Sequence, residues 1–196
     1  NRVQYPDWFN APVPSFGPPD ASLLIVGLAP GLKGANRTGR PFTGDYAGVL
    51  LYGTLLRFGF ASGNYGERAD DGLVLKDCRI TNAVRCVPPG NKPLPEEIST
   101  CRTFLREVLL EMPNVGAILA LGRIAFDTVL RASGLKPSQY KFAHGEAVDM
   151  AGGRKLFGSY HCSRYNTNTG RLTPAMFHRI FEDIAVHLGR GHARAD

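Results

Sequence analysis

The 196-residue chain contains few cysteines and no long apolar run. Its four cysteines include no C-x-x-C pair, so we expect no disulfide framework and a reducing compartment, the cytoplasm. No apolar run approaches the roughly 20 residues that a membrane helix needs, and no signal peptide is visible. These absences exclude a disulfide-rich secreted domain and a membrane partner. Because the chain starts at Asn1, we expect the natural protein to begin earlier.

Two signatures of nucleotide-binding loops are also missing. The sequence has neither the Walker pattern G-x-x-x-x-G-K-[ST] nor G-x-G-x-x-G, so we expect no nucleotide cofactor. The remaining composition, 43% hydrophobic and 20% charged residues, is that of an ordinary globular protein. The length suits one domain with a sizeable core, and we expect it to work as a monomer.

The charge balance favours a polyanionic partner. Lysine and arginine total 23 against 17 acidic residues, which gives a net charge of +6. Such an excess attracts nucleic acid through counterion release, although many basic proteins bind none. The positions of the charges are more informative than the total. Lys33, Arg37 and Arg40 lie in one glycine-rich segment, and Arg164 and Arg171 lie in a polar segment near the end of the chain.

The hydrophobic pattern predicts an α/β fold, a three-layer α/β/α sandwich around a four-stranded parallel sheet. Short apolar runs that alternate with helical patterns are typical of parallel sheets covered on both faces. The expected strands are 21–28, 77–84, 115–122 and 155–161. The expected helices are 46–59, 95–112, 123–133 and 173–189. We expect one domain over 1–196, with an irregular arm at 1–20 and a frayed tail at 190–196.

Unusual polar residues follow three of the predicted strands. In open parallel sheets, ligands bind beyond the carboxyl ends of the strands. The loops after Leu28, Val84 and His161 meet at that edge. The sequence therefore predicts one ligand site built from these three loops.

The first loop carries an aromatic ring and a carboxylate. Phe42 lies among polar and glycine residues, where its ring either stacks on a flat base or plugs the loop. Asp45 is well placed to cap the helix that follows, and the helix N-terminus keeps its carboxylate ionised. That ionised state suits a charge stabiliser or water holder, and it is compatible with the capping role.

The second and third loops supply an amide and an imidazole. The Asn82 amide offers a donor and an acceptor, which match the O4 and N3–H of uracil, although asparagine at a strand end is more often a turn former. His161 can hydrogen-bond a leaving group, but a lone histidine at a strand end is more often structural.

Three segments together resemble the uracil-DNA glycosylase superfamily, and its B-type (family 5) branch in particular. They are GLAPGLKGANRTGRPFTGD (27–45), NAVRCVPPGNKP (82–93) with a later Cys101, and YHCSRYNTNTGRLT (160–173). Their order and spacing agree with the family over most of residues 11–189. The resemblance implies the four-stranded fold predicted above and an enzyme that hydrolyses the N-glycosidic bond of a flipped uracil, with uracil-containing DNA as its partner. For such an enzyme we expect a bacterial or archaeal, nucleoid-associated setting.

The resemblance also implies a role for each site residue. Phe42 would stack on uracil, Asn82 would read its edge, and His161 would bond its O2. Asp45 would be the catalytic carboxylate, because Ala29 stands where other branches carry a water-activating side chain. The pocket backbone would be Gly27, Leu28, Ala29 and Pro30. The DNA contacts would be Lys33, Arg37, Arg40, Ser163, Arg164, Asn166 and Arg171.

The resemblance further implies a 4Fe-4S cluster in the full-length protein. Cys86 and Cys101 match two of the family's four cysteine ligands, and the remaining two are expected before Asn1. Cys78, on a strand, and Cys162, beside His161, match none of the ligands.

Two other functions agree with parts of the sequence. A non-catalytic nucleic-acid-binding module on the same fold would keep affinity for DNA and form no abasic product. A nucleotide-binding or phosphotransfer protein would need a Mg²⁺-binding carboxylate pair and a phosphate-clamping lysine, and Lys33 is a candidate only by position. Within the family, the range of deaminated bases accepted, uracil alone or also hypoxanthine, stays open.

Overall fold

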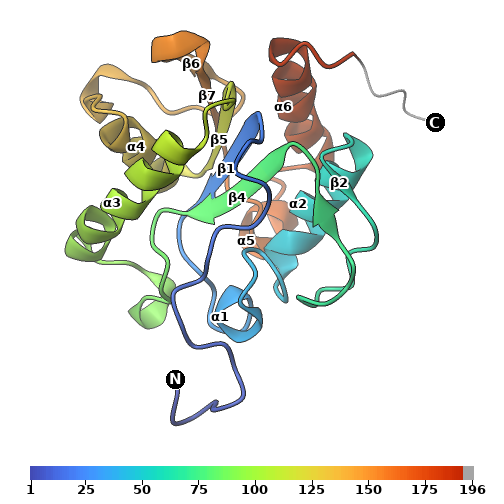
Figure 1. The fold of residues 1–196 in the computed structure, drawn as a ribbon, viewed down its shortest axis with the longest axis vertical. Helices are drawn as coiled ribbons and strands as arrows, with labels where there is room; N and C mark the ends of the chain where they lie inside the picture. The colour runs from blue at the N-terminus through green and yellow to red at the C-terminus, as the bar shows by residue number, and fades with distance from the viewer. Residues whose placement is uncertain (192–196) are drawn as a thin grey trace.

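The computed structural model describes residues 1–191. Within this range one central sheet has the strand order β4-β1-β5-β7-β6 (Figure 1). Its strands are β1 (Leu23–Gly27), β4 (Cys78–Asn82), β5 (Ala117–Leu121), β6 (Ala147–Asp149) and β7 (Lys155–Ser159). The first four in the order run parallel, and β6 pairs antiparallel with β7. The predicted α/β class is confirmed.

The predicted number of strands is wrong by one, because the sheet has five strands rather than four. The additional strand, β6, is only three residues long and lies at the edge of the sheet. So short a segment shows no clear alternation in sequence. The turn after it carries Gly152 and Gly153, both with positive φ, and returns the chain directly into β7. A turn this short can join only antiparallel neighbours.

Helices cover both faces of the sheet (Figure 1). In β1, Leu23 and Ile25 face the cluster that includes residues of α2 (Tyr46–Arg57) and α6 (Pro174–His187). Leu24 and Val26 face the cluster with α3 (Pro95–Glu111) and α4 (Arg123–Ala132). Successive strand residues point to opposite faces, so β1 contributes to both hydrophobic layers. The three-layer arrangement is confirmed.

The helices end close to where the sequence places them. Asp45 is the N-cap of α2, and its Oδ1 accepts a hydrogen bond from the Ala47 amide at 3.1 Å, as predicted. At their carboxyl ends α2, α3, α4 and α6 stop one or two residues earlier than the apolar patterns suggest. Helix ends of this kind are set by local capping rather than by periodicity. None of the helices in residues 1–191 is long and apolar enough to cross a membrane.

The smaller elements lie in the connections. Residues 1–20 form no helix or strand, apart from an isolated bridge between Phe16 and Ile80. The predicted frayed tail lies outside the described residues from 192 onward, and Arg190 is held by an ion pair with Asp77 at 2.8 Å. The other elements are α1 (Ala35–Thr38), β2 (Ala61–Ser62), β3 (Val74–Leu75), α5 (Arg164–Asn168) and the 3₁₀ turns η1 (Pro89–Asn91), η2 (Pro137–Gln139) and η3 (Ala151–Gly153).

Candidate active site

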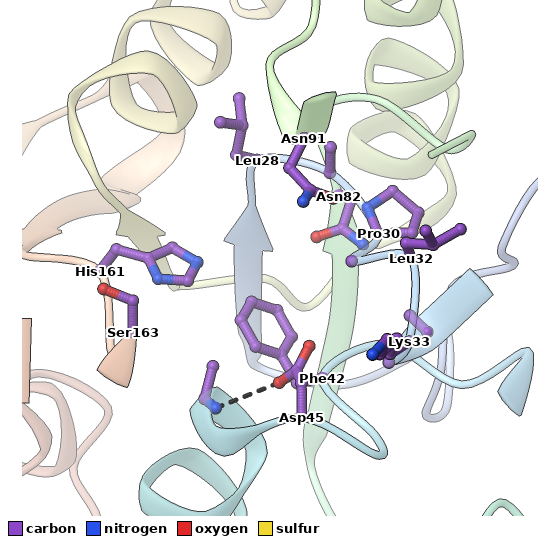
Figure 2. A pocket seen from close by; sticks show the side chains of 15 residues that line it. Leu28, Pro30, Leu32, Lys33, Phe42, Asp45, Asn82, Asn91, His161 and Ser163 are labelled. Atoms are coloured by element: carbon purple, nitrogen blue, oxygen red, sulfur yellow. Dashed lines mark hydrogen bonds between the residues drawn. The ribbon is translucent and has the colours of Figure 1, made fainter. Parts of the chain in front are cut away.

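A cavity of about 630 Å³ opens at the carboxyl edge of the parallel strands (Figure 2). The three loops predicted to meet there all contribute to its wall. Phe42, Asn82 and His161 face into it from different loops, and Asp45 lies beside Phe42 at the start of α2. Its volume is within the range of pockets for small organic ligands.

Asn82 ends β4, directly beside Gly27 at the end of β1. The side chain is 6% exposed, and its Oδ1 is buried with no hydrogen-bond partner among the described residues. Leaving a buried acceptor unpaired costs about 1–3 kcal/mol. A hydrogen-bond donor on a ligand in this pocket would satisfy the Asn82 Oδ1 atom.

Gly27 makes room for the two residues that would hold a base. A Cβ at this position would overlap Asn82 Oδ1 and lie 2.6 Å from Phe42 Cζ. Any larger residue would therefore push the amide or the ring out of place. Gly27 does not itself line the cavity, whereas Leu28, Ala29 and Pro30 do.

Phe42 is held in a left-handed backbone conformation, with φ at 54°. This conformation is costly for a non-glycine residue, and such strain clusters at functional sites. Tyr65 donates its hydroxyl to the Phe42 carbonyl at 3.1 Å, and the Tyr52 hydroxyl bonds the carbonyl of Pro41. These bonds fix the ring at the edge of the cavity, with its centroid 5.9 Å from that of the His161 ring.

His161 presents a neutral imidazole. Burial lowers its pKa to about 4, and no hydrogen bond joins its ring to another residue in the described range. A neutral imidazole has one N–H that can donate a hydrogen bond. Because it carries no charge, it does not need water around it. The Asn166 amide donates to the His161 carbonyl at 2.8 Å and thereby holds the backbone of this residue.

Asp45 is partly buried against the glycine-rich loop. A Cβ on Gly34 would overlap its Oδ2 and lie 3.0 Å from its Cγ, so only glycine lets the loop approach the carboxylate so closely. Burial raises the pKa of Asp45, while the amides of Gly48 and Ala47 act in the opposite direction. A partly desolvated carboxylate at the cavity wall can stabilise a nearby positive charge or orient water.

The expectation that Arg40 contacts DNA is wrong. Its side chain is 5% exposed and forms a bidentate pair with Asp71, at 2.8 and 2.7 Å. It also donates to Thr43 Oγ1 at 2.7 Å and lies over the Tyr52 ring. A buried guanidinium with three of its five donors used inside the protein is not accessible to a phosphate, so Arg40 anchors the loop that carries Phe42.

Of the other basic residues expected at the DNA, one lines the cavity and three are exposed in the two segments that supply much of its wall. Lys33 lines its wall, and Arg37 is exposed one helical turn later. Arg164 and Arg171 are exposed and rest on the rings of Tyr46 and Tyr160, with 5.1 and 4.7 Å to the centroids. Ser163 both lines the cavity and caps α5. Its hydroxyl oxygen accepts a hydrogen bond from the backbone amide of Asn166.

One polar side chain in the wall was not predicted from the sequence, and neither were the apolar side chains of Leu32, Ala35 and Ala47. Asn91 lines the cavity from the turn η1, with φ at 58°. The signal in the sequence was an amide that follows Pro-Pro-Gly in the loop after β4, because this loop starts at the same carboxyl edge of the sheet. The backbone of Gly31 and Gly34 also lines the cavity, as the glycine-rich composition of the loop allows.

Of the two cysteines expected to bind a cluster, Cys86 is exposed and Cys101 is half-buried on α3. Burial raises the pKa of the Cys86 thiol, and the neighbouring Cys101 raises it further. Two thiolates form only half of a cubane's ligand set, and residues 1–191 contain no group of three or more possible metal ligands. This part of the chain alone therefore does not complete the cluster site. Cys78 and Cys162 are fully buried elsewhere.

These features define a pocket for a planar heterocycle that has been turned out of a nucleic acid. An aromatic ring, an amide with an unpaired oxygen, a neutral imidazole and a carboxylate surround one cavity, and a lysine lies in its wall. Enzymes that act on a base inside DNA bind it in pockets of this kind.

The chain belongs to the uracil DNA glycosylase superfamily, whose family model matches residues 14–185. It is 49% identical to a "Type-5 uracil-DNA glycosylase" of Thermus thermophilus over 85% of this chain and 75% of that protein. A protein of the same description from Mycobacterium leprae is 47% identical, over 93% of this chain and 80% of its own length. A "Type-4 uracil-DNA glycosylase" of Thermotoga maritima is 36% identical, over 74% of this chain and 66% of that protein. The predicted resemblance to the family 5 branch is confirmed.

Proposed function

We propose that this chain is a DNA-repair enzyme that extrudes uracil from DNA and hydrolyses its N-glycosidic bond, leaving an abasic site. The observation that carries the proposal is the unpartnered Asn82 Oδ1 in the wall of a cavity that also holds Phe42 and His161. The names of the related proteins point to the same activity.

Recognition of the base follows from the donors and acceptors at its edge. Uracil N3–H would donate to Asn82 Oδ1, and Nδ2 would donate to O4. Stacking on Phe42 adds roughly 1–3 kcal/mol, which offsets the few kcal/mol needed to unstack the nucleotide. That cost is least for a mispaired base, so we expect uracil opposite guanine to be a good substrate.

Cleavage requires stabilisation of charge at both ends of the breaking bond. As the bond breaks, the sugar gains oxocarbenium character and the uracil becomes an anion. A neutral His161 would donate a hydrogen bond to O2 of the departing base, which needs no full proton transfer. The Asp45 carboxylate would stabilise the sugar cation and orient the attacking water.

DNA would lie across the rim of the cavity. Lys33, Arg37, Arg164 and Arg171 are exposed there and suit phosphate contacts. The segment from Ser163 to Arg171 would enter the duplex where the base has left. Asn166 would hold this segment to His161 rather than touch DNA itself, which the bond between them supports.

Two variants test the proposed chemistry. Single-turnover excision from a labelled duplex with one U·G pair should fall tenfold or more in both Asp45→Asn and His161→Ala, by analogy with typical losses of a charge stabiliser or donor. The control Asp149→Asn removes an equally charged group that is 88% exposed on β6 and should excise at the wild-type rate. If Asp45→Asn and His161→Ala also keep that rate, the assignment fails. A chain that binds the duplex and releases no base is a binding module instead.

We also propose that Cys86 and Cys101 hold one side of a 4Fe-4S cluster in the full-length protein. The exposure of Cys86 supports this, as does the cavity in which it lies beside Asn1 and Arg2. We propose that the other two ligands are carried by residues before Asn1, which lies in the same cavity as Cys86. The cluster would have a structural role and take no part in excision. Iron and acid-labile sulfide should be present in the full-length protein and lost in Cys86→Ser.

The setting of the enzyme follows from its substrate. We propose that it works on chromosomal DNA in the cytoplasm, which the bacterial sources of several relatives support. We further propose that it acts as a monomer. Light scattering on the protein with and without duplex DNA checks the second point.

A further inference from the structure

A second cavity lies at the opposite edge of the sheet from the active site. Its volume is about 520 Å³, and its wall comes from the end of α3, the end of α4 and the turn η3 before β7. Helix α4 begins just after the carboxyl end of β5 and runs for ten residues, which carries its far end about 15 Å away. The two cavities therefore face different directions.

Three arginines from three separate elements surround this cavity. They are Arg106 of α3, Arg131 of α4 and Arg154, which follows η3 and precedes β7. No acidic residue lines the cavity, and none of the three forms an ion pair with another residue in the described range. Five other arginines in that range do have an acidic partner, as Arg123 has in Asp127. Three like charges without a counter-charge repel one another, and an acidic ligand relieves that repulsion.

The cavity also has apolar walls. Leu109 is buried, and Leu135 and Met150 are half-buried and pack against the hydrophobic layer beneath. Leu110 stands at the rim with 82% of its side chain exposed. Methionine adapts its shape to different partners, and an exposed leucine beside a cavity is typical of an interaction site.

We propose that this cavity, together with Arg106, Arg131 and Arg154, is a docking site for an acidic peptide segment of a partner protein, one that carries an apolar anchor residue. The arginines pair with the carboxylates, and the anchor enters the cavity between Leu109 and Met150. The partner holds the enzyme from behind while the catalytic face is on DNA.

DNA itself fits this site poorly. A duplex presents phosphates and sugars to such a surface and has no apolar side chain to place in a leucine- and methionine-lined cavity. A duplex seated in the active site would also leave the opposite edge of the sheet free. The charge and the apolar walls together therefore favour a peptide.

The experiment measures binding of a fluorescent peptide with a run of aspartates followed by two leucines. Fluorescence anisotropy should show saturable binding to the wild-type protein. Combined Arg106→Glu, Arg131→Glu and Arg154→Glu substitutions should weaken it by about tenfold or more, given three lost ion pairs and new repulsion. Leu110→Ser, which changes an exposed side chain, should also weaken it and keeps the fold intact. Uracil excision should stay at the wild-type rate in both.

A matched control makes the same change of charge elsewhere. Arg57, Arg68 and Lys76 are exposed and lie outside both cavities, and their combined replacement by glutamate should leave peptide binding within about twofold of wild type. Equal weakening in this control would overturn the proposal in favour of general attraction to a basic protein. Unchanged binding of a peptide with serines in place of the leucines would overturn it in favour of a plain anion site. Displacement of the peptide by uracil-free duplex would overturn it in favour of a DNA surface.

Discussion

Replacement of Gly27 by alanine tests whether the ends of β1 and β4 shape the base pocket. The backbone of Gly27 has an ordinary negative φ, so alanine is allowed there and the only consequence is steric. Its Cβ would overlap Asn82 Oδ1 and come within 2.6 Å of Phe42 Cζ and 2.8 Å of Cε2. Real Cβ atoms do not approach other heavy atoms so closely. The amide and the ring must therefore move, and these are the two groups proposed to bind uracil.

The expected loss follows from what the two groups contribute. Stacking on an aromatic ring contributes roughly 1–3 kcal/mol, and one amide hydrogen bond about 0.5–1.5 kcal/mol. A shift that removes about half of the sum costs about 1.5 kcal/mol, or about tenfold in kcat/KM. The same crowding should destabilise the fold by about 1–3 kcal/mol, as overpacking of a core does.

The assay compares Gly27→Ala with Gly53→Ala under single-turnover conditions. Gly53 lies within α2 with no atom within 4 Å of an added Cβ, so alanine there should stabilise the helix by about 0.5–1 kcal/mol and leave excision unchanged. Urea unfolding separates loss of fold from loss of binding. Wild-type kcat/KM in a folded Gly27→Ala variant would refute the proposed places of Asn82 and Phe42 in base recognition.

Three other perturbations have defined outcomes. Arg40→Met should lower the free energy of unfolding by about 3–5 kcal/mol, because it leaves the buried Asp71 carboxylate unpaired; urea unfolding measures this. Arg40 holds the pKa of Asp71 below its usual value, so this stabilisation is present above the unfolded-state pKa of Asp71 and is lost as the pH falls. The free energy of unfolding of Arg40→Met should therefore change less between neutral and acid pH than that of the wild type. An equal change in both proteins would contradict the pairing of Arg40 with Asp71. In a pH–rate profile, burial of Asp45 raises its pKa above 3.8, so excision should fall on the acid side, and Asp45→Asn should keep only the part of that limb that belongs to His161, whose pKa is about 4. No step should occur near 6.5, because burial keeps His161 neutral there, and a step at that pH that disappears in His161→Ala would contradict the neutral imidazole. Finally, Arg164→Ala should reduce the slope of log K against log salt by about 0.9 for duplex binding, and an unchanged slope would show that this residue touches no phosphate.

Much of the fold could be predicted because the parallel strands are continuous apolar runs. Strand β1 is buried at all five positions, so its sequence shows no alternation and can be recognised by its length and flanking turns. Strand β6 could not be predicted in this way. It has only three residues. Its pairing depends on a glycine turn and on the free edge of β7, which are features of the tertiary structure rather than of the local sequence.

The cavity could be predicted in outline, because the topology of a parallel sheet brings the strand-end loops together. What the sequence does not show is which polar side chains turn inward. Arg40 lies only two residues from Phe42, yet it points into the protein, because Asp71 supplies a carboxylate from 31 positions further along the chain. The sequence places Asn91 in a loop at the same edge of the sheet, but it does not show that this turn residue with positive φ points its side chain into the cavity.

The most direct test of the central proposal is identification of the products from a duplex with one U·G pair. Chromatography should detect free uracil in equal amount to an alkali-labile abasic site, with the phosphodiester backbone intact before alkali. A matched duplex with C·G should yield neither product. If the protein binds the U·G duplex and releases no free uracil, or cuts the backbone and keeps the base attached to its sugar, the account of this cavity as a uracil-excising site is contradicted.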